Sequence, residues 1–287
     1  QALHFAPEDM QGNREVVLAA IKCHAEAFEF ASADLRADPE FLLEVVSEAG
    51  MALQYASEAL RADEAVVLTA VRNDGLALQF ASQELRGRGE VVLAAMMSHR
   101  GALAHAVPEL TSTPKFWLSA AKEEGATLEY APAALLEDLH FVCTAAEITM
   151  WGLAFAPEEL RGNREVVLRA VKCHWQALKF ASAQLRNDRG FILLVVQEAG
   201  SALQYASQAL QADRKVVGEA LRQDGCALQY ASADLRADRA VVLEAVRQDS
   251  LALKFAAAVL QEDGFLKMEA ELSKESRNWD QAWARIA

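Results

Sequence analysis

Short apolar runs recur along the chain at a fixed interval of 25 residues. Between residues 64 and 74, apolar side chains stand at positions 66, 67, 68, 70 and 71, the spacing of one wide helical face. Asp63 precedes this run, and an Asp or Asn takes the same place in most copies. Such a side chain accepts a hydrogen bond from a backbone N–H in the first turn of a helix. The pattern predicts an α-helix of about eleven residues in each copy.

Glycine follows the predicted helix in several copies. These residues are Gly50, Gly75, Gly125, Gly200 and Gly225. Glycine readily adopts the left-handed backbone conformation that ends many helices. We therefore expect these glycines to be left-handed C-terminal caps.

The other half of each copy contains one position that alternates between proline and serine. Proline stands there as Pro7, Pro132 and Pro157, and serine as Ser57, Ser82 and Ser207. Proline inside a helix costs roughly 3 kcal/mol, whereas proline at the first helical position and serine at the N-cap are both favoured. The alternation predicts that a second, short helix carrying Leu60 begins here, after a turn that carries Leu53 and Tyr55.

An aromatic ring also recurs every 25 residues and is followed each time by alanine. The ring positions are Phe5, Phe30, Tyr55, Phe80, Tyr130, Phe155, Phe180, Tyr205, Tyr230 and Phe255, with His105 in the one gap. Helices below ~12–15 residues barely form alone in water, so each repeat must bury its apolar face, ring included, against its neighbours. The predicted fold class is all-α: an open solenoid of about eleven 25-residue repeats with two helices each.

A longer period indicates how the repeats arose. Residues Phe5–His24 return as Phe155–His174 with fifteen of twenty positions identical. We expect a repeat domain over residues 1–276, in which a six-repeat block at 1–150 is duplicated in 151–276. Recent gene duplication and an arrangement of two functional sites are both open explanations.

The two ends of the chain differ in pattern. Lys267 and Glu271 interrupt the apolar stripe, and Trp279, Trp283 and Ile286 then form a last amphipathic turn. This predicts a C-terminal capping segment at residues 277–287. The chain begins within a repeat and without Met, so we expect it to be a piece of a longer or processed protein with further repeats upstream.

The stretch ALQYASEALRADEAVVLTAVRNDG, at residues 52–75, resembles the repeat family catalogued as a domain of unknown function, number 4116. The resemblance covers nearly every repeat from Ala2 to about Asp263 and implies no activity. The layout is also similar, more weakly, to leucine-rich variant repeats, which implies an α-helix paired with a short 3₁₀ helix. The fifth and sixth repeats depart most, with HAVPELTSTPKFW and LLEDLHFVCTAAEITMW, so we expect the central stack to be less regular.

Composition narrows the class of protein. The chain is 53% apolar, but no run approaches the ~20 apolar residues that cross a bilayer, so no membrane span is expected. A net charge of −13 argues against nucleic acid as the main partner. Cys23, Cys143, Cys173 and Cys226 show no disulfide spacing, which favours a reducing intracellular compartment.

The sequence contains no pattern that predicts catalysis. Phosphate-binding loops, nucleophile elbows and zinc-protease motifs are all missing. His24, His99 and His174 recur every third repeat, which separates them by roughly 25 Å in a stack of helices ~8–10 Å apart. A zinc site needs its ligands within ~2.0–2.3 Å of one ion. We therefore predict no catalytic residue, no metal site and no cofactor.

Five apolar residues occupy repeat positions that are polar or glycine elsewhere, and they are the candidate partner-binding residues. They are Met97, Ile148, Met150, Trp151 and Trp175. Exposed apolar clusters mark contact surfaces, and Met and aromatic residues are enriched at the centres of protein interfaces. A locally rebuilt core around the irregular repeats explains the same residues equally well at this stage.

Two rows of polar residues recur as well. Gln54, Gln79, Gln204 and Gln229 share one repeat position, and Arg36, Arg61, Arg86, Arg161, Arg186 and Arg236 share another beside the acidic caps. Such rows are expected to be solvated faces with weak ion pairs of at most ~1 kcal/mol each. The acidic extended surface would suit a basic or amphipathic partner segment.

The leading hypothesis for function is a non-catalytic scaffold for protein–protein interaction that binds a protein or peptide, as part of a larger protein or assembly. One alternative is a regulatory or targeting module attached to an enzyme outside this segment. Another is a nucleic-acid-reading helical repeat, which would require basic grooves that this acidic chain does not predict.

Overall fold

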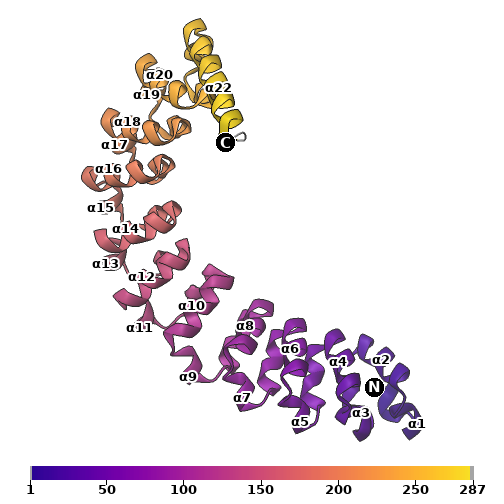
Figure 1. The fold of residues 1–287 in the computed structure, drawn as a ribbon. Helices are drawn as coiled ribbons and strands as arrows, with labels where there is room; N and C mark the ends of the chain where they lie inside the picture. The colour runs from indigo at the N-terminus through magenta and orange to yellow at the C-terminus, as the bar shows by residue number, and fades with distance from the viewer. Residues whose placement is uncertain (1, 285–287) are drawn as a thin grey trace. The chain divides into compact units, whose positions relative to one another are not determined.

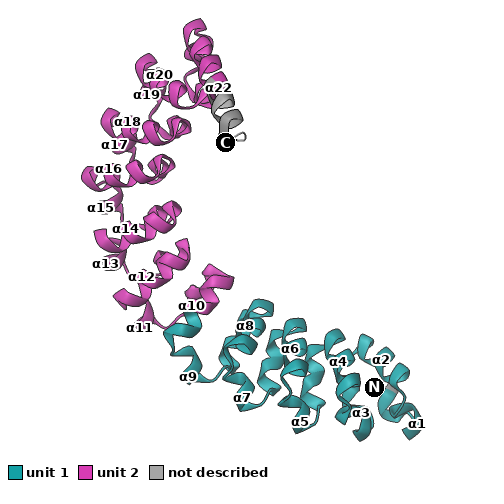
Figure 2. Ribbon diagram, viewed as in Figure 1, with its two compact units in different colours: residues 1–117 teal, residues 118–287 magenta. Residues whose placement is uncertain are grey.

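The protein is an all-α repeat solenoid (Figure 1). The structure, a computed structural model, describes residues 2–284, and the side chains of residues 3–275. Within these residues every element is a helix and no strand occurs. The chain divides into two compact units, residues 1–117 and 118–287, shown in teal and magenta in Figure 2. Each unit is described separately below.

Each repeat begins with a short 3₁₀ helix and continues into a short α-helix. Repeat positions are numbered from 1 to 25 starting at residue 1, so the 3₁₀ helix of each repeat after the first begins at position 25 of the preceding count. The 3₁₀ helices are η1 (Ala2–Phe5), η2 (Ala25–Phe30), η3 (Gly50–Tyr55), η4 (Gly75–Phe80), η5 (Arg100–His105), η6 (Gly125–Tyr130), η7 (Met150–Leu153), η8 (Trp175–Phe180), η9 (Gly200–Tyr205), η10 (Gly225–Tyr230) and η11 (Ser250–Phe255). The short helices are α1 (Glu8–Gln11), α3 (Ala33–Ala37), α5 (Glu58–Arg61), α7 (Gln83–Arg86), α9 (Pro108–Thr111), α11 (Ala133–Leu136), α13 (Glu158–Arg161), α15 (Ala183–Arg186), α17 (Gln208–Gln211), α19 (Ala233–Arg236) and α21 (Ala258–Gln261).

A longer α-helix completes each repeat. These helices are α2 (Arg14–Cys23), α4 (Pro39–Glu48), α6 (Glu64–Asn73), α8 (Gly89–Ser98), α10 (Pro114–Glu123), α12 (Leu139–Ile148), α14 (Arg164–Cys173), α16 (Arg189–Glu198), α18 (Arg214–Gln223), α20 (Arg239–Gln248) and α22 (Gly264–Ala284). Within each unit the long helices lie along one side and the short helices along the other (Figure 1). The predicted turn around Leu53 and Tyr55 is the 3₁₀ helix η3, so a repeat has three helical elements rather than two.

The predicted helix starts are confirmed by the capping geometry. Asp213 accepts hydrogen bonds from the backbone N–H groups of Lys215 and Val216, at 2.9 and 3.1 Å, and so caps α18. Ser207 caps α17 in the same way through its hydroxyl. Proline takes this N-cap place in α13, where Pro157 precedes the first helical residue. The aspartate and serine side chains satisfy backbone donors that have no partner inside the helix, whereas the Pro157 side chain accepts no such hydrogen bond.

The expectation of left-handed glycine caps is wrong. No described glycine has a positive φ. Glycine is needed at repeat position 25 because the 3₁₀ helix that it begins comes close to the long helix that follows it in the chain. A Cβ on Gly225, the first residue of η10, would lie 2.5 Å from the carbonyl oxygen of Ala245 in α20. Gly50, Gly75 and Gly200 meet the corresponding carbonyls in the same way.

The core is built from the same repeat positions throughout. Ala202 and Leu203 of η9 are fully buried, as are Val216, Val217 and Ala220 of α18. The substantial contacts between elements all lie within one repeat or between adjacent repeats, as nearest-neighbour stacking requires. The fifth and sixth repeats keep the same order of helical elements as the other repeats.

Ion pairs join the beginnings of adjacent long helices. Each pairs the arginine at position 14 with the aspartate cap of the next repeat: Arg14 with Asp38, Arg164 with Asp188 at 2.7 Å, Arg189 with Asp213 at 2.7 Å, Arg214 with Asp238 at 2.5 Å and Arg239 with Asp263 at 2.9 Å. Glu64 and Arg88 form the same contact with the charges exchanged. The exchange shows that opposite charge at this contact is maintained, whichever side carries it.

The predicted C-terminal cap, residues 277–287, has no described side chains. The backbone of α22 continues to Ala284, but Trp279, Trp283 and Ile286 lie outside the residues whose side chains are described. Among the described helices, none is both long enough and apolar enough to span a membrane.

Close packing at position 25 predicts opposite responses at two glycines. Gly225→Ala should lower the free energy of unfolding by about 1–3 kcal/mol, because the new methyl group meets the Ala245 carbonyl. Gly264→Ala should be neutral or stabilising, since nothing lies within 4 Å of a Cβ there. Urea denaturation of both variants measures the difference. Equal destabilisation by the two changes would contradict the packing explanation.

The ion pairs predict a loss of stability in acid. The side-chain hydrogen bond from Arg189, with those from the backbone of α18, lowers the pKa of Asp213 to about 2. An unfolded aspartate has a pKa near ~3.9, so the stabilisation is complete above that pH and is lost as the pH falls towards 2. Asp213→Asn retains the cap, as Asn163 does for α14, but removes the charge. Its urea midpoint should lie below that of the wild type at pH 6 and match it near pH 2; a constant difference would contradict the assignment.

Candidate protein-binding surface

The recurring aromatic rings form a row on the surface of each unit. Phe30, Tyr55, Phe80, Phe155, Phe180, Tyr205, Tyr230 and Phe255 are half-buried, and Tyr130 is 38% exposed. The expectation that these rings belong to the buried face is therefore wrong in part. The residues at repeat positions 2 and 3, such as Ala202 and Leu203, already fill the interior beneath them. The rings at repeat position 5, which end most of the 3₁₀ helices, are therefore left partly accessible to solvent.

Trp151 extends this row in the second unit. Its indole stacks on Phe155, with ring centroids 6.2 Å apart and planes at 16°. It also contacts Phe180 of the next repeat, at 5.5 Å between centroids. A Cβ on Gly125 would lie 2.6 Å from Trp151 Cδ1, so the indole also packs closely against the preceding repeat. Trp151 thereby bridges three repeats while remaining half-buried.

Trp175 joins the row one repeat later. Its indole lies 6.0 Å from the ring of Tyr205, measured between centroids. Trp175 occupies position 25, where Gly200 and Gly225 stand in the following repeats. Met150 has the same position one repeat earlier, and both residues are half-buried. Bulky residues at this otherwise glycine position enlarge the row along η7 and η8.

Tyrosines continue the row towards the C-terminal end. Burial raises the pKa of the Tyr230 phenol, and the nearby Asp224, Tyr205 and Cys226 contribute to the shift. In the first unit, burial likewise raises the pKa of Tyr55, with Glu29 and Glu26 adding to it. Both phenols therefore remain neutral hydrogen-bonding groups at physiological pH.

Polar side chains at position 4 flank the rings. Lys179 Nζ lies 5.7 Å from the centroid of the Phe180 ring, and Lys254 Nζ lies 5.0 Å from that of Phe255. The Gln79 and Gln229 amides each donate a 3.1 Å hydrogen bond to a carbonyl of their own 3₁₀ helix. The row thus combines apolar ring faces with amide and ammonium groups, and its aromatic residues are of the kind enriched at protein interfaces.

The predicted contact residues do not all come together. Trp151, Trp175 and Met150 belong to the aromatic row of the second unit. Ile148 is half-buried at the end of α12. Met97 is 52% exposed on α8 of the first unit. Their role in binding a partner stays a prediction.

The arginine row is packed rather than solvated. Arg36, Arg61, Arg86, Arg161, Arg186 and Arg236 are half-buried, and each has a buried Nε atom with no hydrogen-bond partner among the described residues. The acidic caps pair instead with the arginines at position 14. Glutamine replaces arginine at this position in Gln211 and Gln261, whose amides bond carbonyls of the adjacent 3₁₀ helix. The hydrogen bonds of Gln211 and Gln261 indicate that residues at this position have a structural role at the ends of the short α-helices.

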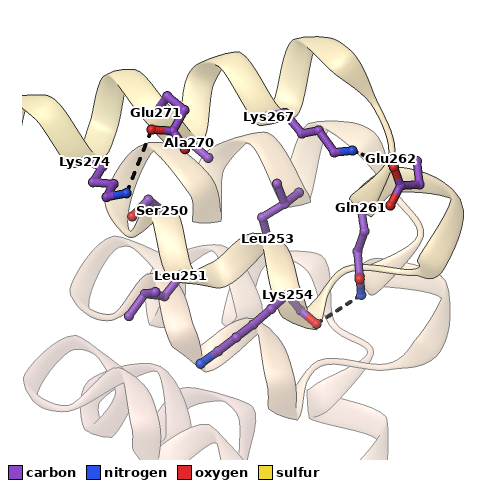
Figure 3. A pocket seen from close by; sticks show the side chains of 10 residues that line it. All are labelled: Ser250, Leu251, Leu253, Lys254, Gln261, Glu262, Lys267, Ala270, Glu271 and Lys274. Carbon is purple, nitrogen blue, oxygen red and sulfur yellow. Dashed lines mark hydrogen bonds and ion pairs between the residues drawn. The ribbon is translucent and has the colours of Figure 1, made fainter.

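Pockets in the second unit offer further concave surface. One pocket of about 490 Å³ lies between η11 and α22 (Figure 3). Gln261 points into it and donates to the Lys254 carbonyl at 3.0 Å, while Lys267 and Lys274 pair with Glu262 and Glu271 at 2.5 and 4.0 Å. Two of its three ammonium groups are therefore already neutralised by carboxylates of the same chain.

The side chains that bind metals in proteins are scattered over the described residues. No three His, Cys, Asp or Glu side chains there lie close enough together to hold a metal ion. Cys143 is buried, Cys226 is half-buried, and Cys23 and Cys173 are exposed as free thiols. Burial raises the pKa of the Cys226 thiol to about 11, and Asp249 and Asp224 add to the shift, so this thiol is protonated at neutral pH.

The fold and the repeated surface define an all-α repeat protein, and sequence comparison identifies its family. The profile of the family described as "Domain of unknown function (DUF4116)" matches residues 1–36, 38–86, 138–186, 163–211, 188–236 and 213–260. These matches cover well over half of the chain, so the protein belongs to this family. No curated protein and no solved structure matches it.

Proposed function

We propose that the protein is a non-catalytic scaffold that binds an extended segment of a partner protein along the aromatic row of its second unit. The main support for this proposal is that Trp151 and Trp175 lie in this row and that both indoles are half-buried. Tryptophan and tyrosine in such positions contribute large contact area with little loss of side-chain freedom. The same surface would serve a regulatory or targeting module of a larger enzyme.

The spacing of the rings supports an extended partner segment. Adjacent helical repeats lie ~8–10 Å apart, and an extended chain advances ~3.3 Å per residue. Every third residue of the partner would therefore meet a new ring. The net charge of −13 favours a segment with basic or neutral residues between its apolar anchors.

A double variant tests the proposal while following the chain's own repeat pattern. Trp175→Gly introduces the residue found at Gly200 and Gly225, and Trp151→Leu introduces the residue found at Leu76 and Leu251. A phage-displayed library of 12-residue peptides is selected on the wild-type protein. Enriched peptides should carry apolar residues three positions apart and bind the double variant at least about 30-fold more weakly, because the two indoles together are expected to contribute at least about 2 kcal/mol.

Met10→Ala, at an exposed apolar residue of the first unit, serves as the matched control and should leave peptide affinity unchanged. Thermal unfolding checks that the double variant stays folded. The proposal fails if no peptide is enriched, or if the enriched peptides bind the wild type and the folded double variant equally well.

A further inference from the structure

The outer face of the long helices carries a leucine row with one conspicuous exception. Position 18 is leucine in Leu18, Leu43, Leu68, Leu93, Leu118, Leu168, Leu193 and Leu243, and each of these side chains is half-buried. The three other residues at this position are Cys143, Gly218 and Met268. Gly218 alone removes the side chain entirely, in the middle of α18.

Nothing in the local backbone requires this glycine. Glycine is the poorest helix former after proline, so it weakens the interior of a ten-residue helix. Gly218 has no positive φ. Space does not require it either, because a Cβ there would meet only Glu244 Oε2, at 3.9 Å. What distinguishes this position is therefore the space that the missing leucine leaves on the surface.

That space is a groove of about 510 Å³ across α16, α18 and α20. Leu193 and Val241 contribute apolar surface to its lining. Arg189 and Arg214 also line it, and each is already paired with an aspartate cap of the next repeat.

The charges along α18 are arranged on both sides of the glycine. Lys215 lies one turn before Gly218 on the same helix face, and Arg222 lies one turn after it. Arg222 is neutralised by Glu219, at 2.6 Å, and by Glu244, at 3.4 Å. The Lys215 ammonium forms no ion pair within the described part of the chain. The groove therefore places the Lys215 ammonium about one helical turn from the hollow at Gly218, and its lining combines the apolar Leu193 and Val241 with polar groups that include Gln197, Glu219 and Glu244.

We propose that this groove binds a helical segment of a partner protein, which inserts a leucine-sized side chain at Gly218 and places a carboxylate on Lys215. In eight other repeats the chain's own leucine occupies this position, which indicates the size and polarity of the missing group. A helix fits because residues three or four apart on its face lie ~5–6 Å from each other. That spacing matches the separation of Lys215 and Gly218 on α18. The groove lies on the long helices, so it is independent of the aromatic row on the 3₁₀ helices.

Gly218→Leu gives a sharp test because it restores the residue of the other repeats. It should raise the urea midpoint, since leucine favours the helix more than glycine does, and it should block the groove. A displayed library of helical peptides is selected on the wild-type protein and counter-selected on Gly218→Leu. Enriched peptides should carry Leu, Ile or Phe with Asp or Glu three or four residues away. They should bind Gly218→Leu at least tenfold more weakly, and Lys215→Gln several-fold more weakly.

Gly218→Ala provides the graded control, with an equal or higher urea midpoint than the wild type and a smaller loss of peptide affinity. Equal binding to the wild type and Gly218→Leu, failure to enrich any helical peptide, or enrichment without an acidic residue would overturn the proposal. Self-association of the wild type that Gly218→Leu abolishes would assign the groove to a second copy instead. Thermal stabilisation by inorganic phosphate that Lys215→Gln abolishes would assign it to a small anion. These results do not depend on Trp151 or Trp175, so they separate this site from the aromatic row.

Discussion

The close approach of each repeat to the next is the constraint on which the rest of the structure depends. The helices have four to ten residues in nearly every repeat, too few to be stable alone in water. They persist because positions 2, 3, 16, 17, 20 and 21 bury apolar side chains between repeats. Glycine at position 25 brings the 3₁₀ helix against the backbone of the following long helix. The aspartate caps also join adjacent repeats at the polar surface, because each one caps a helix of its own repeat and forms an ion pair with an arginine of the repeat before it.

This packing also determines what each surface can offer. The small residues at positions 2 and 25 place the 3₁₀ helices close to the stack, and the rings at position 5 then lie half-buried above the interior. Trp151 and Trp175 enlarge that row at positions occupied by smaller residues elsewhere. Gly218 does the reverse on the long helices, where it removes one side chain from a regular leucine row. Repeats with uniform interiors can thus carry different surfaces through single substitutions.

Much of the fold could be predicted from local chemistry, because caps and apolar spacing act within one repeat. Asp213 and Ser207 begin helices as their side chains predict. The role of Gly225 could not be predicted, since it depends on the Ala245 carbonyl in α20, which is distant from the glycine in the sequence. The half-burial of Tyr205 also depends on how neighbouring 3₁₀ helices stack.

The candidate site was predictable in part for the same reason. Trp151 and Trp175 could be recognised as departures from the repeat, but their ring partners follow from inter-repeat geometry. Met97 was grouped with them because it also departs from its repeat position, but it lies in the other unit of the structure. Gly218 also departs from the leucine found at its repeat position, but only the lining of the groove shows that the missing side chain leaves a hollow.

Hydrogen exchange on Leu203→Ala tests the nearest-neighbour account most directly. Leu203 is fully buried in η9, and its truncation should cost about 2–5 kcal/mol. Leu251→Ala, at a residue that is 57% exposed, is the matched control. The account predicts that protection falls most in residues 176–225 and progressively less in more distant repeats, with residues 1–117 unchanged. A uniform loss of protection along the whole chain would contradict it.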